Sequence, residues 1–230
     1  MAQYHGLYTA AMQMEALIFD ADGTLVDSEV PGLDVLHRLM AEHGLHMERE
    51  AVHDQFRGVR MADVVSWIAE RLNEPSPEFH ARFMAMTREG MAERFRQGLE
   101  PMPGAVDLLA RLAVPHCVAT NGPREKVELT LQMCGLRPWF GERVFSAYEV
   151  GVFKPEPGLF IHAARALGAE PTRCAVVEDS ATGIAGGLAA GMKVFAVCPP
   201  HLVPLAHQNQ VTFMDGLADL LHLLPAHALR

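Results

Sequence analysis

The sequence has few cysteines, and none of them forms a recognisable metal or redox motif. Only four occur in 230 residues, and no two stand in a Cys-x-x-Cys arrangement. A thioredoxin-like dithiol and a cysteine-rich zinc site are therefore excluded. Three of the four lie in or beside apolar stretches, where cysteine usually behaves as a small hydrophobic residue. We expect reduced, buried cysteines in a cytoplasmic protein.

Positive charge is also scarce. Lys and Arg total 19 against 28 Asp and Glu, which gives a formal net charge of -9. A chain with this balance lacks the basic surface that nucleic acids and anionic membranes require. An anionic ligand must instead be held by local features, such as a bound cation or the N-termini of helices.

Long hydrophobic runs are absent as well. No stretch reaches the roughly eighteen apolar residues that a membrane-spanning helix needs. Residues 1–15 lack the basic start and the long apolar centre of a signal peptide. We expect residues 1–14 to form a poorly ordered leader, with Met12 or Met14 as alternative starts. Half of the residues are hydrophobic, which suffices for a sizeable core without disulfides. We expect a monomer or a weak homodimer.

The region between residues 29 and 99 has the pattern of a helical bundle. Apolar residues recur there at helical spacing, and no strand-like alternation is found. The pattern predicts four helices, over about 31–44, 48–56, 61–72 and 77–96. We interpret this region as a helical domain inserted between two strands.

From residue 100 onward, short apolar segments of strand length alternate with helical patterns. Such alternation predicts a parallel sheet covered by helices on both faces. The fold class is therefore α/β, a Rossmann-like doubly wound parallel sheet formed by residues 1–28 and 100–230. After the strand that begins at residue 16, strands are predicted at 116–120, 143–145, 174–177, 193–197 and 211–213.

Two acids end the first predicted strand. Residues two apart in an extended chain point to the same side, so Asp20 and Asp22 could present both carboxylates to one crevice, unless the chain turns between them. A divalent cation such as magnesium would justify this crowding, because it prefers hard oxygen ligands. The alternative is a strand that ends in an ordinary acidic turn at Gly23.

Further polar residues follow later strands. Thr120 and Asn121 end the second strand, Lys154 lies in a proline-rich loop, and the acid pair Glu178-Asp179 ends the fourth. In open parallel sheets the ligand crevice lies beyond these carboxyl ends. Taken singly, each has a plainer explanation: a turn, a surface charge and an acidic helix cap. The set together favours one functional site.

The same residues carry a family resemblance. Asp20-Ala21-Asp22-Gly23-Thr24-Leu25-Val26-Asp27-Ser28 fills every position of the pattern Asp-x-Asp-Gly-Thr-Leu-x-Asp-Ser. That pattern opens the haloacid dehalogenase-like hydrolases, and the downstream residues match the remaining three motifs in order. The chain resembles this superfamily, in particular the β-phosphoglucomutase-like branch with a helical cap, which includes bacterial sugar phosphatases.

The resemblance implies a magnesium-dependent phosphatase. Asp20 would attack phosphorus to give an aspartyl-phosphate, and Asp22 would act as the general acid and then as the general base. Mg²⁺ would be bound by Asp20, by the backbone carbonyl of Asp22 and by Asp179. Glu178 would support this metal site from behind the ligands, and Thr24 would support the loop after the nucleophile.

The resemblance also assigns the phosphate donors and the substrate class. The Thr120 hydroxyl, the Asn121 backbone amide and the Lys154 ammonium would hold the phosphoryl oxygens. Arg57 and Arg60, at a turn of the cap, could clamp a second anionic group, although both could equally be exposed charges. The substrate would be a small phosphorylated metabolite, namely a sugar phosphate or a sugar acid such as 6-phosphogluconate.

Two other functions remain open at this stage. A phosphosugar mutase would use the same Asp20 and Asp22 but return the phosphoryl group to the substrate. A non-catalytic binding protein on the same scaffold would be expected to lack a motif residue, and none is missing.

Overall fold

A computed structural model describes residues 13–57 and 59–230, and its centre is a parallel sheet. Six strands pair in parallel in the order β3-β2-β1-β4-β5-β6. They agree with the predicted strands to within one or two residues. Their bounds are β1 Ala16–Phe19, β2 His116–Thr120, β3 Val144–Ser146, β4 Cys174–Glu178, β5 Lys193–Ala196 and β6 Val211–Phe213.

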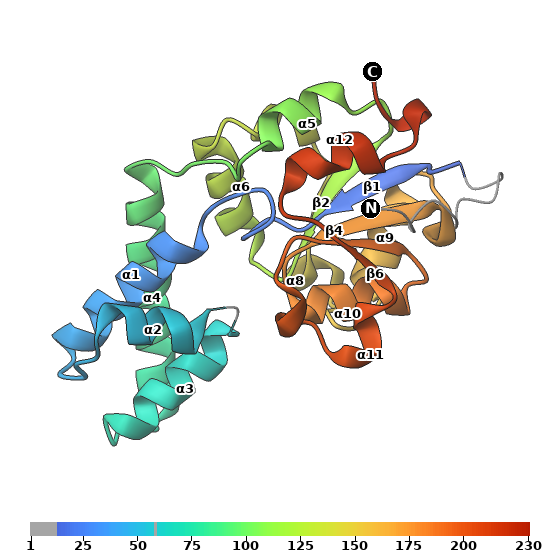
Figure 1. The fold of residues 1–230 in the computed structure, drawn as a ribbon. Helices are drawn as coiled ribbons and strands as arrows, with labels where there is room; N and C mark the ends of the chain where they lie inside the picture. Colours follow the sequence, from blue (N-terminus) through green and yellow to red (C-terminus); the bar gives the residue numbers. More distant parts are fainter. Residues whose placement is uncertain (1–12, 58) are drawn as a thin grey trace.

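Helices cover both faces of this sheet (Figure 1). Alternate residues of β1 point to opposite faces: Leu17 and Phe19 pack into one apolar cluster, Ala16 and Ile18 into the other. Helices α5 (Ala105–Arg111), α6 (Arg124–Met133), α7 (Arg137–Phe140) and α12 (Leu220–Leu223) border the first cluster, whereas α9 (Gly158–Ala166) and α10 (Ala181–Ala189) border the second. The predicted doubly wound α/β fold is confirmed.

Four helices between β1 and β2 form a separate bundle beside the sheet (Figure 1). Their buried apolar residues make a core of their own, in which Leu36, Val65 and Phe79 are each almost fully buried. The helix termini match the predictions closely, except that α1 begins before Pro31 because proline fits the first helical turn. The helices are α1 Glu29–Glu42, α2 Arg49–Phe56, α3 Met61–Arg71 and α4 Pro77–Arg96.

The two segments that join this bundle to the sheet run side by side. The Asp27 amide donates to the Glu100 carbonyl at 3.1 Å, and the Met102 amide donates to the Leu25 carbonyl at 2.8 Å. These backbone hydrogen bonds tie the outgoing and the returning chain together at the edge of the sheet.

Short elements complete the chain: α8 (Ala147–Val150), α11 (Leu205–Gln208) and the 3-10 turns Pro171–Arg173, Pro200–Leu202, Leu217–Asp219 and Ala226–Ala228. Residues 1–12 of the predicted leader lie outside the described part of the chain. Met14, in contrast, packs into the core, so the leader as predicted extends too far. Within the described residues, no helix is both long and apolar enough to cross a membrane.

Candidate active site

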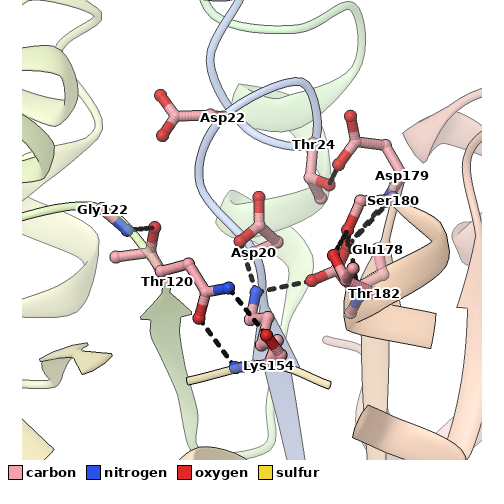
Figure 2. Close-up of polar contacts among 12 residues, drawn as sticks. Asp20, Asp22, Thr24, Thr120, Gly122, Lys154, Glu178, Asp179, Ser180 and Thr182 are labelled. Carbon is pink, nitrogen blue, oxygen red and sulfur yellow. Dashed lines mark hydrogen bonds and ion pairs between the residues drawn. The ribbon is translucent and has the colours of Figure 1, made fainter. Parts of the chain in front are cut away.

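The strand ends bring the predicted residues together at one edge of the sheet (Figure 2). β1 lies between β2 and β4, and the chain order reverses between β1 and β4. In doubly wound sheets the ligand crevice lies at this reversal, outside the carboxyl ends of the strands. Asp20 follows β1, Thr120 ends β2, Glu178 ends β4 and Asp179 follows it. Three segments far apart in the sequence thus meet at one place.

The loop after β1 turns sharply at Gly23. Its φ of 79° is in the left-handed region, which glycine adopts most easily. A Cβ atom there would lie 2.0 Å from the Asp179 Oδ2 atom, so a side chain would collide with the end of β4. Glycine is therefore required both by the turn and by the approach of the two loops.

Lys154 lies at the centre of the site and bridges two carboxylates. Its Nζ donates to Asp20 Oδ1 and to Glu178 Oε1, each at 2.5 Å. Lys154 is 6% exposed and Glu178 is fully buried, so these charges depend on one another rather than on water. The two flanking carboxylates raise the pKa of Lys154 above its ordinary value, despite the opposing effect of burial.

Asn121 fixes the position of this lysine. Its Oδ1 accepts from the Lys154 backbone amide at 2.9 Å, and its Nδ2 donates to the Lys154 carbonyl at 3.2 Å. The side chain of Asn121 therefore has a role that sequence reasoning missed, since only its backbone amide was considered. Thr120, 2% exposed, accepts at Oγ1 from the Gly122 amide at 2.9 Å, which shapes the turn after β2.

Glu178 is anchored by the first turn of α10. Its Oε2 accepts from the amides of Asp179 and Ser180 at 3.1 Å each, and from Ser180 Oγ at 2.9 Å. A Cβ atom at Gly183 would lie 1.8 Å from Glu178 Oε1, so this helical glycine makes room for the carboxylate. The glycines of α10 thus serve close packing, as the small residues of this segment indicate.

Three acids form a group that could hold a metal ion. Carboxylate oxygens of Asp20, Glu178 and Asp179 all lie within 4.8 Å of one another. Burial raises the pKa of Asp20 to about 7, against the charge of Lys154 and with that of Glu178. Burial and the same neighbouring acids raise the pKa of Asp179 well above its usual value, although Thr24 Oγ1 donates to it at 3.2 Å. The single positive charge of Lys154 does not neutralise the three carboxylates.

Asp22 follows the second of the two possibilities stated for the acid pair. The chain turns between the two acids, and the Asp22 side chain points away from Asp20, so the two carboxylates do not converge as an extended strand would place them (Figure 2). Ser28 Oγ donates to its Oδ1 at 2.5 Å, and Lys126 Nζ lies 2.8 Å from its Oδ2. Although burial acts in the other direction, the charge and hydrogen bond of Lys126 hold the pKa of Asp22 below its ordinary value.

The acidic group contains the two predicted carboxylate ligands, Asp20 and Asp179. It also contains Glu178, whose predicted place behind the ligands stays a prediction. The expected ligand atom of Asp22 is its backbone carbonyl, and that role stays a prediction.

The two arginines of the helical bundle make different contacts. Arg57 Nη1 is 3.6 Å from Glu29 Oε2, and the negative charge of Glu29 contributes to the raised pKa of Asp179. Arg57 is therefore linked to Asp179 through Glu29. Arg60, directly before α3, instead makes two hydrogen bonds to Asp63 of that helix, at 3.0 and 2.7 Å, and both side chains are exposed.

Sequence reasoning missed Lys126 altogether. Its only sequence signal is its place in the first turn of α6, directly after the segment that follows β2. Ser28 was quoted as part of the first motif, but without a role. Both residues become visible only through their contacts with Asp22.

Comparison with known proteins agrees with this geometry. The family profile described as haloacid dehalogenase-like hydrolase matches residues 14–191, which is most of the chain. The chain belongs to the haloacid dehalogenase-like hydrolases. The chain is also 33% identical over 202 residues to 6-phosphogluconate phosphatase of Escherichia coli, covering 87% of this chain and 90% of that one. The predicted class of enzyme, a phosphatase of this family, is confirmed.

Two solved structures have the same fold. A HAD-family hydrolase of Deinococcus radiodurans, solved with bound phosphate and sodium, is 33% identical, covers 94% of this chain and 90% of its own, and gives a TM-score of 0.66. A β-phosphoglucomutase of Clostridium difficile is 19% identical, with a TM-score of 0.72 and coverage of 90% and 93%. The second likeness shows the fold alone.

Proposed function

We propose that the chain is a magnesium-dependent phosphatase that acts on a small phosphorylated sugar or sugar acid in the cytoplasm. The observation that carries this proposal is the buried contact of Lys154 with Asp20, at the crevice where the Asp20, Glu178 and Asp179 carboxylates gather. A nucleophilic carboxylate, a phosphate-binding ammonium and a cation site are what phosphoryl transfer needs in one place.

In this proposal Asp20 attacks phosphorus and forms an aspartyl-phosphate, which water then hydrolyses. Asp22 has to take up a proton from water as it leaves Lys126, because its present partners hold its pKa below the ordinary value. It then gives this proton to the leaving alkoxide and later takes one from the attacking water. Lys154, the Thr120 hydroxyl and the Asn121 amide bind phosphoryl oxygens. For the first step Asp22 has to turn from its present partners toward the leaving group, because its side chain points away from Asp20.

The residues present fit a magnesium ion. Three carboxylates share a small volume with a single ammonium, so the group carries excess negative charge that a hard divalent cation would offset. Asp20 and Asp179 would hold the ion together with the carbonyl of Asp22, with Glu178 and Thr24 orienting them. When bound, the ion supplies positive charge for the phosphoryl oxygens.

We expect Mg²⁺ to stabilise the protein more strongly as the pH rises. Between about pH 4 and 7 Asp20 keeps a proton in the folded protein that it has lost in the unfolded chain. The free energy of unfolding of the metal-free protein therefore falls as the pH rises. Above about pH 7 Asp20 is ionised in both states, and the folded protein carries the full cost of burying this charge unless a cation offsets it. The gain in melting temperature from Mg²⁺ should therefore be larger at about pH 8 than at about pH 5.5.

Thermal unfolding in EDTA and in Mg²⁺ measures this gain. Asp179→Asn serves as the control, because it removes one of the three carboxylates and should reduce the gain at both pH values. A gain that is equal at the two pH values, or that survives this substitution in full, would contradict the assigned cation site.

The substrate class is supported by relatives and by one cap residue. The Escherichia coli relative is named for 6-phosphogluconate, a substrate with a carboxylate besides its phosphate. Arg57, which contacts Glu29, would bind such a second anion when the cap approaches. Arg60 would share this role after its guanidinium leaves Asp63. In this proposal residues 29–99 form the cap.

A matched pair of substrates tests the proposal. We expect phosphate release from 6-phosphogluconate and from glucose 6-phosphate in Mg²⁺, faster from the acid, and none in EDTA. Both esters share the same leaving oxygen, so their ratio reports recognition of the second anion. Failure to release phosphate from a broad panel of sugar phosphates would refute the phosphatase and favour a binding protein. Release without a bisphosphate activator would exclude a mutase.

A further inference from the structure

The carboxylate of Asp22 is held by two partners from different parts of the molecule. One oxygen accepts from Ser28 Oγ at 2.5 Å, and the other lies 2.8 Å from Lys126 Nζ. Ser28 stands at the start of α1, whereas Lys126 stands on α6 of the sheet domain. Both carboxylate oxygens are thus engaged, and the Asp22 side chain points away from Asp20 (Figure 2).

Ser28 occupies the position from which a serine normally caps a helix. Its side chain makes no capping hydrogen bond to α1, and its hydroxyl is given to Asp22 instead. Ser28 is 3% exposed, so this contact is shielded from water. Because the Ser28 hydroxyl bonds to Asp22 and not to a backbone amide of α1, the contact with Asp22 is favoured over capping of the helix.

Lys126 has the opposite character. Its side chain is 33% exposed and the Asp22 side chain is 28% exposed, so water reaches their ion pair. A pair of this exposure is weak enough to break within a catalytic cycle, because water competes for both charges. Lys126 lies on α6, which borders the core of the sheet.

We propose that Lys126 is a positioning residue that holds Asp22 away from the reaction centre until substrate arrives. This inference rests on the proposed phosphatase function, in which Asp22 has to reach the leaving oxygen. With Lys126 in place, the Asp22 side chain turns toward the leaving oxygen only when a bound substrate and the approaching cap make that position more favourable. In the absence of Lys126, only the contact with Ser28 opposes this rotation of Asp22.

Two substrates with different leaving groups test the assignment. An alkyl phosphate such as glucose 6-phosphate needs its leaving oxygen protonated, whereas p-nitrophenolate departs without a proton. Since kcat/KM reports the steps up to phosphoryl transfer, Lys126→Met should raise kcat/KM for the alkyl phosphate by about two- to fivefold. For p-nitrophenyl phosphate the change should be smaller, so the alkyl-to-aryl ratio rises.

Arg124→Met is the matched control. Arg124 lies on the same helix with a similar exposed fraction, 31%, but pairs with Glu128 and Glu149 rather than with Asp22. The alkyl-to-aryl ratio should stay at the wild-type value in this variant. In an Asp22→Asn background, Lys126→Met should no longer change the ratio, because the side chain that it releases has lost its proton-transfer function.

Other results would overturn the inference. An equal loss with both substrates would make Lys126 a binding residue, and a selective loss with the alkyl phosphate would mean that Lys126 helps Asp22 to act. A wild-type enzyme that hydrolyses neither ester would refute the phosphatase itself. A wild-type enzyme that is active, with an unchanged ratio in Lys126→Met, would refute only the positioning role.

Discussion

Replacing Asp20 by Asn is expected to abolish phosphate release while the fold stays intact. The amide keeps the shape of the carboxylate but cannot attack phosphorus, so no aspartyl-phosphate forms. We expect kcat to fall on the order of 10⁴-fold or more, as for other residues that act covalently. The substituted side chain can still accept a hydrogen bond from Lys154 at the position where Asp20 now accepts one at 2.5 Å.

Stability separates this result from misfolding. Burial of a charged Asp20 raises its pKa to about 7, so removal of the charge should leave the melting temperature of the metal-free protein at pH 8 unchanged or higher. Asp27→Asn, the same change at an exposed position on the same loop, should keep wild-type activity. Appreciable turnover in the Asp20 variant would end its assignment as the nucleophile.

The convergence of the site could be foreseen because parallel sheets restrict where strand ends lie. Once apolar strands were recognised before Asp20, Thr120 and Glu178, their carboxyl ends had to meet at one edge. Lys154 is not at a strand end, and only its place in the family pattern predicted it. Two hydrogen bonds explain its position at the site: Asn121, which follows β2, holds the backbone of Lys154 at both the amide and the carbonyl.

The direction of the Asp22 side chain could not be foreseen in the same way. Strand periodicity places residues two apart on one side, but β1 ends at Phe19 and the chain bends at Ala21, between the two acids, so the rule no longer applies. The direction of the Asp22 side chain depends on Ser28 and on Lys126, which is remote in the sequence. No local pattern encodes such a pair. The contact of Glu178 with Lys154 could not be foreseen either, since the two residues lie 24 positions apart.

Replacing Lys154 by Met is expected to abolish phosphate release and to lower the free energy of unfolding more than any of the other proposed substitutions. The apolar side chain keeps most of the volume next to the Phe160 ring, whose centroid lies 5.0 Å from the ammonium. The charge, however, disappears from between Asp20 and the fully buried Glu178. Breaking a buried pair from one side costs roughly 3–5 kcal/mol, because it leaves a charge without compensation.

The pH dependence of that loss identifies its cause. The charge of Lys154 lowers the pKa of Asp20 against the effect of burial, so without the lysine the Asp20 pKa rises above about 7. The folded variant then keeps protons that its unfolded chain has lost, and its deficit in unfolding free energy should widen as the pH rises from about 5 to 8. Chemical denaturation at a series of pH values measures this.

Two further variants separate charge from packing. Lys193→Met is the matched control, because Lys193 lies 4.5 Å from the ring of Phe195 but outside the acidic group. Its loss of unfolding free energy should be smaller than that of Lys154→Met. Adding Glu178→Gln to Lys154→Met removes the buried charge and should recover much of the stability without restoring phosphate release. Phosphate release needs the ammonium of Lys154, whereas stability needs only a balance of buried charge. If the double variant recovered both phosphate release and stability, Lys154 would act on the fold alone.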